Sequence, residues 1–333
     1  MKYISTLVAA GLSFGSAATA QDYPTKDIQG IIQWGAGGST DTVMRSVTPR
    51  AEEILGGNIV MQNVTGAVGA IALNQVATAP ADGYTLLMGA ENPLIYKVMG
   101  LGQRDYGDFV PISILAQGTP VLVAGSEAPF DDYAGMMQYI EDNPGELRLG
   151  STGPGGVPSV ITAMMEAVEG DLDVTSVPYD GDGPALTALQ GGAIDVMPAV
   201  LGAAMETIRA GNIKPLAVIA EEPVEQLPDV EPITSFDGDY AQYLPWGPFF
   251  GVFAPEDTPQ EAVDALREAY GAAAQEQAFR DLMESRAYTI TNITGDEAER
   301  FLSDWQSTTS WLLHDSGIAE TSPEEFGISR PGE

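Results

Sequence analysis

The chain has 333 residues, of which 44% are hydrophobic, and it contains no cysteine. The absence of cysteine excludes disulfide bonds, thiolate metal sites and a cysteine nucleophile. The formal net charge is −33, from 14 Lys and Arg residues against 47 Asp and Glu residues. A field of this sign excludes nucleic acid and anionic membrane surfaces as partners. Because the acids are scattered along the chain, we attribute them to a solvated surface suited to saline surroundings.

The N-terminus predicts a secretory signal peptide at residues 1–20. Lys2 precedes a short apolar run at 4–14, and Ala18-Thr19-Ala20 fits the small-x-small pattern of a cleavage site. The apolar run is shorter than the ~20 residues that span a bilayer. We therefore expect an exported protein whose mature chain starts near Gln21.

Predicted strands and helices then alternate, which is typical of α/β folds with mostly parallel sheets. Apolar periodicity and glycine boundaries predict strands at 27–34, 58–63 and 84–89, and helices at 40–55 and 69–79. A second series predicts strands at 120–124, 147–150, 174–177, 194–197 and 215–219, with helices at 133–142, 160–168, 184–190 and up to Ala210. A strand at 247–254 precedes two further helices, each announced by a capping box, at 258–261 and 294–297.

The simplest architecture for these elements is two α/β lobes joined by crossing strands. A chain of this length has enough residues for two domains. Residues 21–123 and 246–333 are predicted to form lobe 1, and residues 124–245 to form lobe 2. The C-terminal segment then packs back on the first lobe, and the hinges are expected near 121–124 and 245–250. We expect a monomer.

Two glycine-rich loops are the strongest candidates for a binding site. They run from Gly35 to Asp41 and from Gly150 to Gly156, each between a predicted strand end and a helix start. Glycine lets backbone N–H groups approach a ligand, and a helix N-terminus adds roughly half a positive charge. Two such loops facing each other could hold a carboxylate without Lys or Arg, at the strand ends where open α/β sheets bind ligands. The alternative, that each loop is only a tight turn, stays open.

The same loops do not match nucleotide-binding motifs, and catalytic groups are scarce. The first loop lacks GxGxxG spacing and neither ends in GK[ST]. The only histidine, His314, lies in the last predicted helix, and no Gly-x-Ser-x-Gly elbow is present. Metal sites lack His and Cys ligands and EF-hand spacing. We predict a binding protein without cofactor or metal. A secreted hydrolase or lyase with an Asp or Glu base in the same cleft is the alternative, and a sensory module is a third reading.

A series of ordered motifs resembles one known family over the whole mature chain. It resembles the Bug-type solute receptors of tripartite tricarboxylate transporters. The motifs are Tyr23-Pro-Thr-Lys-Asp-Ile28, Gly37-Gly-Ser-Thr-Asp41, Asn63-Val-Thr-Gly-Ala-Val-Gly69, Ala79-Pro-Ala-Asp-Gly-Tyr-Thr-Leu-Leu87, Val177-Pro-Tyr-Asp-Gly-Asp-Gly-Pro-Ala-Leu186 and Gly191-Gly-Ala-Ile-Asp-Val-Met197. The resemblance implies a two-lobed periplasmic clamshell without enzymatic activity. Such a receptor delivers a small organic acid to membrane transporter subunits.

The resemblance also implies which residues contact the ligand. Family members hold a ligand carboxylate between the two loops through backbone amides, hydroxyls and bridging water. Asp41 is expected to cap its helix more than to touch the ligand. The complete set of ligand-binding candidates is Trp34, Gly35, Ala36, Gly37, Gly38, Asp41, Glu91, Ser151, Thr152, Gly153, Gly155, Ser159, Tyr179, Asp180, Ala199 and Trp246.

Four of these candidates depart from the family pattern. Ser159 stands at a position often held by histidine, and Asp180 stands where the family has lysine. Glu91 replaces small hydroxyl residues, and Ala199 stands where an acid is common. Fewer cations and more acids argue against a tricarboxylate such as citrate and favour a monocarboxylate, which could carry an amine or a ring. Tyr179 or Trp246 would then be an apolar wall.

Two alternatives for the acids remain open. A divalent ion could bridge Glu91 to an anionic ligand. Equally, Asp180 and Glu91 could belong only to the acidic surface, since the chain is acid-rich throughout.

Overall fold

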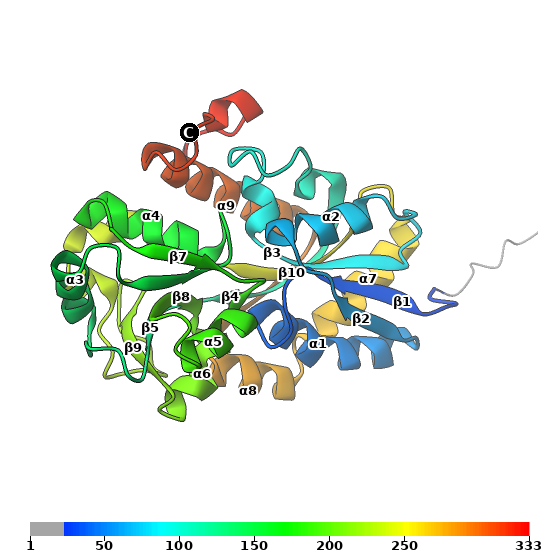
Figure 1. Cartoon of the computed structure of the whole chain (residues 1–333). Coiled ribbons are helices and arrows are strands. Elements are labelled where there is room, and N and C mark those ends of the chain that lie inside the picture. Colours follow the sequence, from blue (N-terminus) through cyan, green and yellow to red (C-terminus); the bar gives the residue numbers. More distant parts are fainter. Residues whose placement is uncertain (1–22, 333) are drawn as a thin grey trace, which may run out of the picture.

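The computed structural model describes residues 23–332, so the predicted signal peptide lies outside the described residues. Figure 1 shows two α/β lobes side by side, each with a central sheet covered by helices. The sheet of the first lobe has the strand order β11-β4-β10-β3-β1-β2. Its strands are β1 (Ile28–Ile32), β2 (Ile59–Asn63), β3 (Thr85–Ala90), β4 (Phe109–Gly118), β10 (Phe249–Pro255) and β11 (Tyr288–Ile293). Its helices are α1 (Ser39–Leu55), α2 (Ala70–Ala77), α7 (Gln260–Ala273), α8 (Gln277–Ser285) and α9 (Gly295–Asp315).

The second lobe has a sheet of order β7-β6-β8-β5-β9. Its strands are β5 (Pro120–Gly125), β6 (Arg148–Ser151), β7 (Thr175–Pro178), β8 (Val196–Val200) and β9 (Ile213–Val218). Its helices are α3 (Tyr133–Asp142), α4 (Val157–Glu169), α5 (Asp182–Gln190) and α6 (Leu201–Arg209). The predicted two-lobed α/β fold is confirmed.

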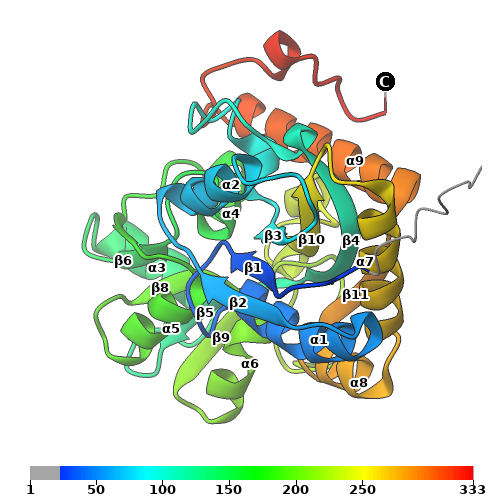
Figure 2. The ribbon, with the colours of Figure 1, turned by 90° about the vertical axis from the view of Figure 1, so that its right-hand side faces the viewer.

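The expectation of mostly parallel sheets is wrong, because both sheets are mixed. Strand β1 pairs in parallel with β2 and β3, and β6 with β7 and β8. In the first sheet, β10 runs antiparallel to β3 and β4, and β11 runs antiparallel to β4. In the second sheet, β5 runs antiparallel to β8 and β9. The reason is the crossing itself: β4 leads the chain out of the first lobe and β10 brings it back, so these neighbours run in opposite directions. Figure 2 shows them beside each other in the first lobe.

Strands β4 and β11 and helix α8 are not among the predicted elements. Strand β4 is buried on both faces, so it lacks the polar and apolar alternation of a half-exposed strand. It also contains Pro111, which cannot donate to a neighbouring strand. The structure accommodates this proline beside a register shift in the pairing with β10, between Val252 and Phe253.

The two predicted capping boxes do not form their side-chain hydrogen bonds. Helix α7 has Pro259 as its N-cap, and the hydroxyl of Thr258 is buried without a hydrogen-bond partner among the described residues. Thr294 is the N-cap of α9, but its side chain makes no capping hydrogen bond. The helices form nevertheless, because α7 packs against α1 and β4, and α9 packs against β4.

The first crossing lies earlier than expected. Strand β4 ends at Gly118 and β5 begins at Pro120 in the other sheet, so residues 120–123 belong to the second lobe. The returning segment lies directly against this point, where the Gly118 N–H donates to the Pro248 carbonyl at 2.8 Å. A Cβ atom on Gly247 would overlap the carbonyl oxygen of Gly118. The two crossings therefore meet backbone against backbone.

Helix α9 anchors the returning segment through two indoles. The Trp305 Nε1 donates to the Gly247 carbonyl at 2.9 Å, and the Trp246 Nε1 donates to the Thr309 Oγ1 at 3.0 Å. The two rings lie 5.9 Å apart. Trp246 is therefore part of the crossing, and its ring packs on α9 and does not line the interlobe cavity described below.

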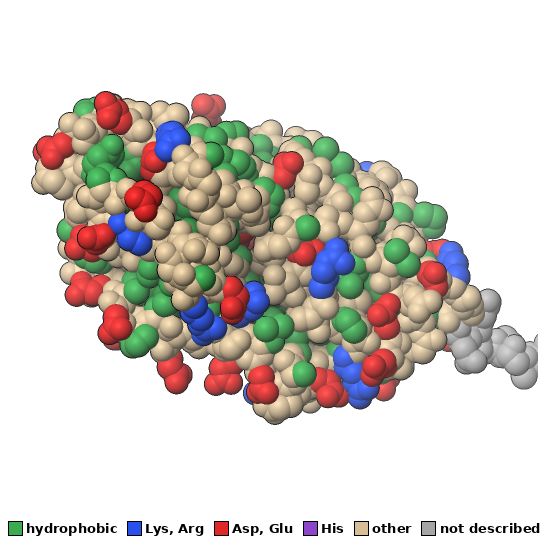
Figure 3. Space-filling model, turned by 60° about the horizontal axis from the view of Figure 1, so that its bottom comes forward, with side chains coloured by type: hydrophobic (Ala, Val, Ile, Leu, Met, Phe, Trp, Pro, Cys, Tyr) green, Lys and Arg blue, Asp and Glu red, His purple; other side chains and the backbone are tan. Residues whose placement is uncertain are grey.

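The acidic residues are dispersed on the surface shown in Figure 3, where Asp and Glu side chains alternate with neutral residues and a few Lys and Arg. None of the described helices is both long enough and apolar enough to cross a membrane.

We expect Gly247→Ala to destabilise the protein, because the added methyl group overlaps the backbone of the other crossing. Forced overpacking of this kind costs about 2 kcal/mol, which corresponds to a fall in Tm of about 5 °C. The matched control is Gly238→Ala, where a Cβ meets nothing within 4 Å. Thermal unfolding of both variants tests this, and equal Tm values would contradict the close approach.

Candidate functional site

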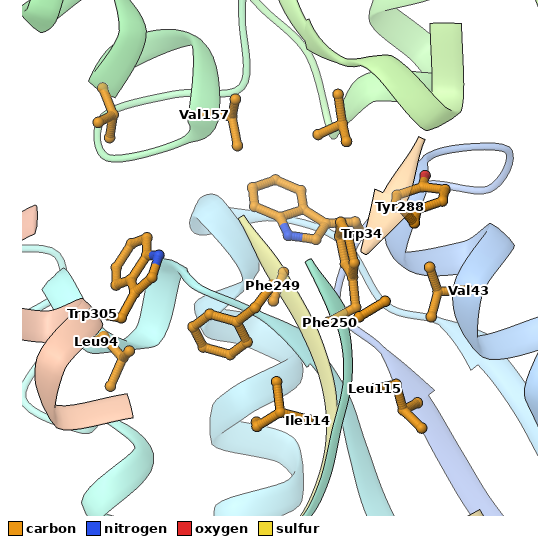
Figure 4. Packing of buried hydrophobic residues seen from close by; sticks show 14 of the residues in the cluster. Trp34, Val43, Leu94, Ile114, Leu115, Val157, Phe249, Phe250, Tyr288 and Trp305 are labelled. Carbon is orange, nitrogen blue, oxygen red and sulfur yellow. The ribbon is translucent and has the colours of Figure 1, made fainter. Parts of the chain in front are cut away.

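A small cavity lies between the two lobes. Its volume is about 30 Å³, enough for one or two water-sized groups. The first lobe and the crossing contribute Trp34, Gly38, Ser39, Thr40, Ala90, Glu91, Pro248 and Phe250, and the second lobe contributes Thr152, Val157, Gly181, Asp182 and Val200. Figure 4 shows the Trp34 indole at the junction, between Val157 of the second lobe and Phe250 of the first.

Helix N-termini from both lobes converge on this cavity. Helix α1 begins at Ser39, α4 at Val157 and α5 at Asp182, and Val200 is the N-cap of α6. None of these four helices has a side-chain hydrogen bond at its N-cap. Their first N–H groups lack intrahelical partners and carry partial positive charge. The cavity therefore has a positive backbone potential, although no Lys, Arg or His lines it.

Hydrogen bonds across the cleft hold the lobes together. The Gly35 N–H donates to the Asp180 carbonyl at 2.9 Å, and the Asn92 Nδ2 donates to the Gly155 carbonyl at 2.8 Å. Beside the cavity, the Ser39 hydroxyl donates to the Asp182 carboxylate at 3.1 Å. The lobes are thus closed on each other in this structure.

The first glycine loop and the start of α5 approach each other closely, backbone against backbone. A Cβ atom on Gly183 would overlap the Ala36 carbonyl oxygen, and one on Gly35 would lie 2.7 Å from the Asp180 carbonyl oxygen. Any larger residue at these positions would keep the two lobes further apart. Glycine here serves the contact between lobes as well as the conformation of the loop.

Two carboxyl groups face the cavity, one from each lobe. Glu91 follows β3 and is only 3% exposed. Burial raises its pKa to about 8, and the nearby charge of Asp182 adds to the effect. Burial also raises the pKa of Asp182, to about 6, against hydrogen bonds from the Ser39 hydroxyl and the Val200 backbone. The Glu91 Oε2 has no hydrogen-bond partner among residues 23–332.

The comparisons with known proteins identify the family. The family model described as "Tripartite tricarboxylate transporter family receptor" matches residues 43–318. The chain belongs to this family. The resemblance to Bug-type receptors is therefore confirmed.

Individual relatives cover nearly the whole receptor. Protein BugT of Bordetella pertussis is 28% identical over 319 residues, which is 93% of this chain and 95% of BugT. MatC from Rhodopseudomonas palustris, solved with bound malate, has a TM-score of 0.78 and 26% identity, covering 90% of this chain and 100% of MatC. R. palustris Rpa4515, solved with adipate, has a TM-score of 0.82 and 25% identity, covering 90% of this chain and 99% of Rpa4515.

The receptor's first loop reaches the cavity only in part. Trp34 and Gly38 line it, whereas Ala36 and Gly37 are exposed and point away. The Gly37 N–H is taken by the Asp41 carboxylate at 3.0 Å, which also accepts a hydrogen bond from Arg45. Burial opposes ionisation of Asp41, but its hydrogen bonds outweigh burial and lower its pKa. Asp41 thus stabilises the loop from inside the first turn of α1, while Gly38 is the N-cap.

The second loop presents Thr152 to the cavity and turns its other candidates away. Ser151, Gly153 and Ser159 line a separate groove, the outer groove, between α4 and strands β6 and β7, to which Met99 and Ile318 of the first lobe also contribute. The Ser151 hydroxyl accepts a hydrogen bond from the Gly153 N–H at 3.1 Å. Gly155 contributes its carbonyl to the interlobe bond with Asn92 and does not line the cavity.

The remaining candidates lie elsewhere in the second lobe. Tyr179 packs against that lobe's core, so it is not a wall of the cavity. Ala199 is fully buried in β8. Asp180 is exposed, and it contacts the first lobe through its carbonyl and through a hydrogen bond from Thr65 at 3.3 Å. The acid at the cavity is Asp182, two residues later.

Sequence reasoning missed Asp182, Ser39, Thr40, Val157 and Val200. The sequence did contain a signal for them, namely the start of a helix after a glycine-rich segment. A residue in the first turn of such a helix faces the same way as the free N–H groups. Among the described residues, no three His, Cys, Asp or Glu side chains gather as ligands for a metal ion. A divalent ion bound by Glu91 in this cavity could reach one further carboxylate of the cavity lining, that of Asp182.

The free energy of unfolding should fall as pH rises between 4.5, the ordinary pKa of glutamate, and about 8, the pKa of Glu91 in the fold. In this window the folded protein retains a proton that the unfolded chain has lost, so raising the pH favours unfolding. Glu91→Gln removes this contribution, and its Tm should change less between pH 5 and pH 8. The control is the exposed Glu127→Gln. The same pH dependence in wild type and Glu91→Gln would contradict the assignment.

We expect Gly183→Ala to hold the lobes apart, because its methyl group meets the Ala36 carbonyl. Alanine favours a helix over glycine by roughly 1 kcal/mol, so α5 itself should not be weakened. Small-angle scattering should show a larger radius of gyration than for wild type. Gly191→Ala, at the other end of α5 and free of such a contact, should keep the wild-type radius.

Proposed function

We propose that this protein is an extracytoplasmic receptor that captures a small carboxylate between its lobes. It then delivers that carboxylate to the membrane subunits of a tripartite tricarboxylate-type transporter. The observation that carries the proposal is the convergence of uncapped helix N-termini on one interlobe cavity without a cationic side chain. Such N-termini bind anions through backbone N–H groups. The hydroxyls of Thr40 and Thr152 add donors at the same place.

The relatives support a carboxylate ligand and a membrane partner. MatC was solved with malate and Rpa4515 with adipate, and both are dicarboxylates. The family description supplies the transporter as the partner. The predicted signal peptide at 1–20 supports the periplasm as the location, and we propose that the receptor acts there as a monomer.

Capture requires the lobes to open and close. A cavity of about 30 Å³ is smaller than a whole organic acid, since ligand sites usually measure at least roughly 300 Å³. The guest therefore enters when the cross-lobe bonds of Gly35 and Asn92 are broken. The hinges we propose are the crossings at 118–120 and 247–249, around which each lobe moves as a body.

One observation favours the alternative of a secreted hydrolase or lyase. Glu91 is a buried carboxyl with a pKa of about 8 in a cavity, which is a property of general bases. The two functions differ in the fate of the guest. Chromatography after prolonged incubation returns an unchanged acid from a receptor and a product from an enzyme.

We expect Thr40→Val and Thr152→Val each to weaken carboxylate binding by about tenfold, because each removes one hydrogen-bonding hydroxyl at nearly constant volume. The ligand for this test is the acid that gives the largest thermal shift in a panel of mono-, di- and tricarboxylates. Affinity is measured by isothermal titration calorimetry.

Thr162→Val is the matched control for these variants. Thr162 lies on α4 but lines the outer groove and not the cavity. Wild-type affinity in both cavity variants, or an equal loss in the control, would contradict the site.

A further inference from the structure

The two carboxyl groups at the cavity are not explained by an anionic guest alone. Glu91 is 3% exposed and its Oε2 has no hydrogen-bond partner among the described residues. Leaving a buried polar atom of this kind unpaired is costly. Asp182 approaches from the other lobe and lines the same cavity. A guest with only carboxylate groups would add a negative charge beside Asp182 and would favour a protonated Glu91.

The described protein does not supply the missing positive charge. The cavity lining contains no Lys, Arg or His. A metal ion is disfavoured because only two carboxylates are within reach, and no cluster of three suitable side chains exists in residues 23–332. The compensating cation therefore has to arrive with the guest.

We propose that the guest is zwitterionic, and that Glu91 of the first lobe and Asp182 of the second hold its cationic nitrogen. Its carboxylate binds at the uncapped helix N-termini of the same cavity. This inference rests on the proposed receptor function and specifies its ligand class as an amino-carboxylate. A cavity of about 30 Å³ accommodates one ammonium-sized group between the two acids.

The arrangement couples recognition of the nitrogen to closure of the lobes. Each lobe contributes one acid, so closure without a cation brings two carboxyl groups together at low dielectric. An ammonium group replaces this repulsion with two attractive contacts and offers three N–H donors. An amino-carboxylate thus stabilises the closed state more than the same acid without nitrogen.

Few other groups near the acids can titrate in the physiological range. Glu91 faces Tyr96 and Tyr106, and Asp182 lies near Tyr288. Burial raises the pKa of all three tyrosines, so their hydroxyls stay neutral. The Arg286 guanidinium, which lowers the pKa of Tyr288, donates to the Gly202 carbonyl. Proton exchange on binding therefore reports on Glu91 and Asp182.

The first test compares matched ligand pairs by thermal shift and calorimetry. The pairs are glutamate with glutarate, aspartate with succinate, and γ-aminobutyrate with butyrate, which differ only in the ammonium group. We expect the amino member of at least one pair to bind on the order of 10- to 100-fold more tightly, as charge-assisted hydrogen bonds allow. Tighter binding of the plain acids overturns the inference and leaves the receptor function in place. If neither member of any pair binds, the result counts against both the inference and the receptor function.

Variants then assign the preference to the two acids. Glu91→Gln and Asp182→Asn preserve the shape of the side chains. Each should reduce the ratio of affinities, amino member over plain acid, by at least about tenfold. The plain acid should bind equally well or better to these variants, which a merely structural loss would not produce. Glu127→Gln, on an exposed side chain, should keep the wild-type preference. An unchanged preference in both cavity variants overturns the inference.

Proton exchange gives an independent readout. Closure buries Glu91 and raises its pKa, and a cation beside Glu91 offsets this rise, so binding of an amino-carboxylate at pH 7 should take up no proton. Calorimetry in buffers of different ionisation enthalpy measures the sign. Proton uptake would mean that protonated Glu91 donates to the guest's carboxylate, and this result overturns the inference.

Discussion

The closed form of this receptor depends on backbone meeting backbone between the lobes. The loop after β1 can touch the start of α5 only because Gly35 and Gly183 have no side chain at the point of contact. This contact encloses the cavity and buries Glu91. It also brings the N-terminus of α5 to the N-terminus of α1. The raised pKa values of the two acids are consequences of the same closure, since burial is their largest cause.

The electrostatic field at the cavity is set by nearby helix N-termini and differs from the field of the molecule's net charge. A chain with a net charge of −33 repels anions at a distance. The field of a helix N-terminus acts only within about the first turn, but several such N-termini act together here. Surface acids are screened by salt within about 8 Å at physiological ionic strength. The proposed function therefore allows an anionic group to bind at the closed cavity, and in our proposal the two inward acids discriminate between anions and zwitterions.

Rigid and movable parts of the molecule are distinct. Trp246 and Trp305 fix the returning crossing against α9 through indole hydrogen bonds and ring contacts. The cross-lobe contacts at the glycine loops are single hydrogen bonds between separate pairs of residues. The crossings can thus act as a pivot while the loops separate. This division gives Trp246 a structural role, although the hypothesis of a monocarboxylate ligand had suggested it as an apolar wall of the binding site.

The sequence by itself determined the local features of this protein. Alternating periodicity gave the order of most strands and helices, and ordered motifs identified the family. The glycine loops indicated where helices begin, and Glu91 stood out as an acid in an unusual place. Each of these properties depends on neighbours in the chain, through capping, turn geometry and the spacing of apolar residues.

Only the tertiary structure decided which residues face the guest. Asp180 and Asp182 are two residues apart, and the turn into α5 places only Asp182 at the cavity. Ala36 and Gly37 belong to the expected loop but are exposed and do not line the cavity: the Ala36 carbonyl faces Gly183, and Asp41 accepts the Gly37 N–H. Strand β4 and the mixed sheets followed from the path of the crossings. These outcomes depend on how two distant segments meet, and no local pattern in the sequence encodes that meeting.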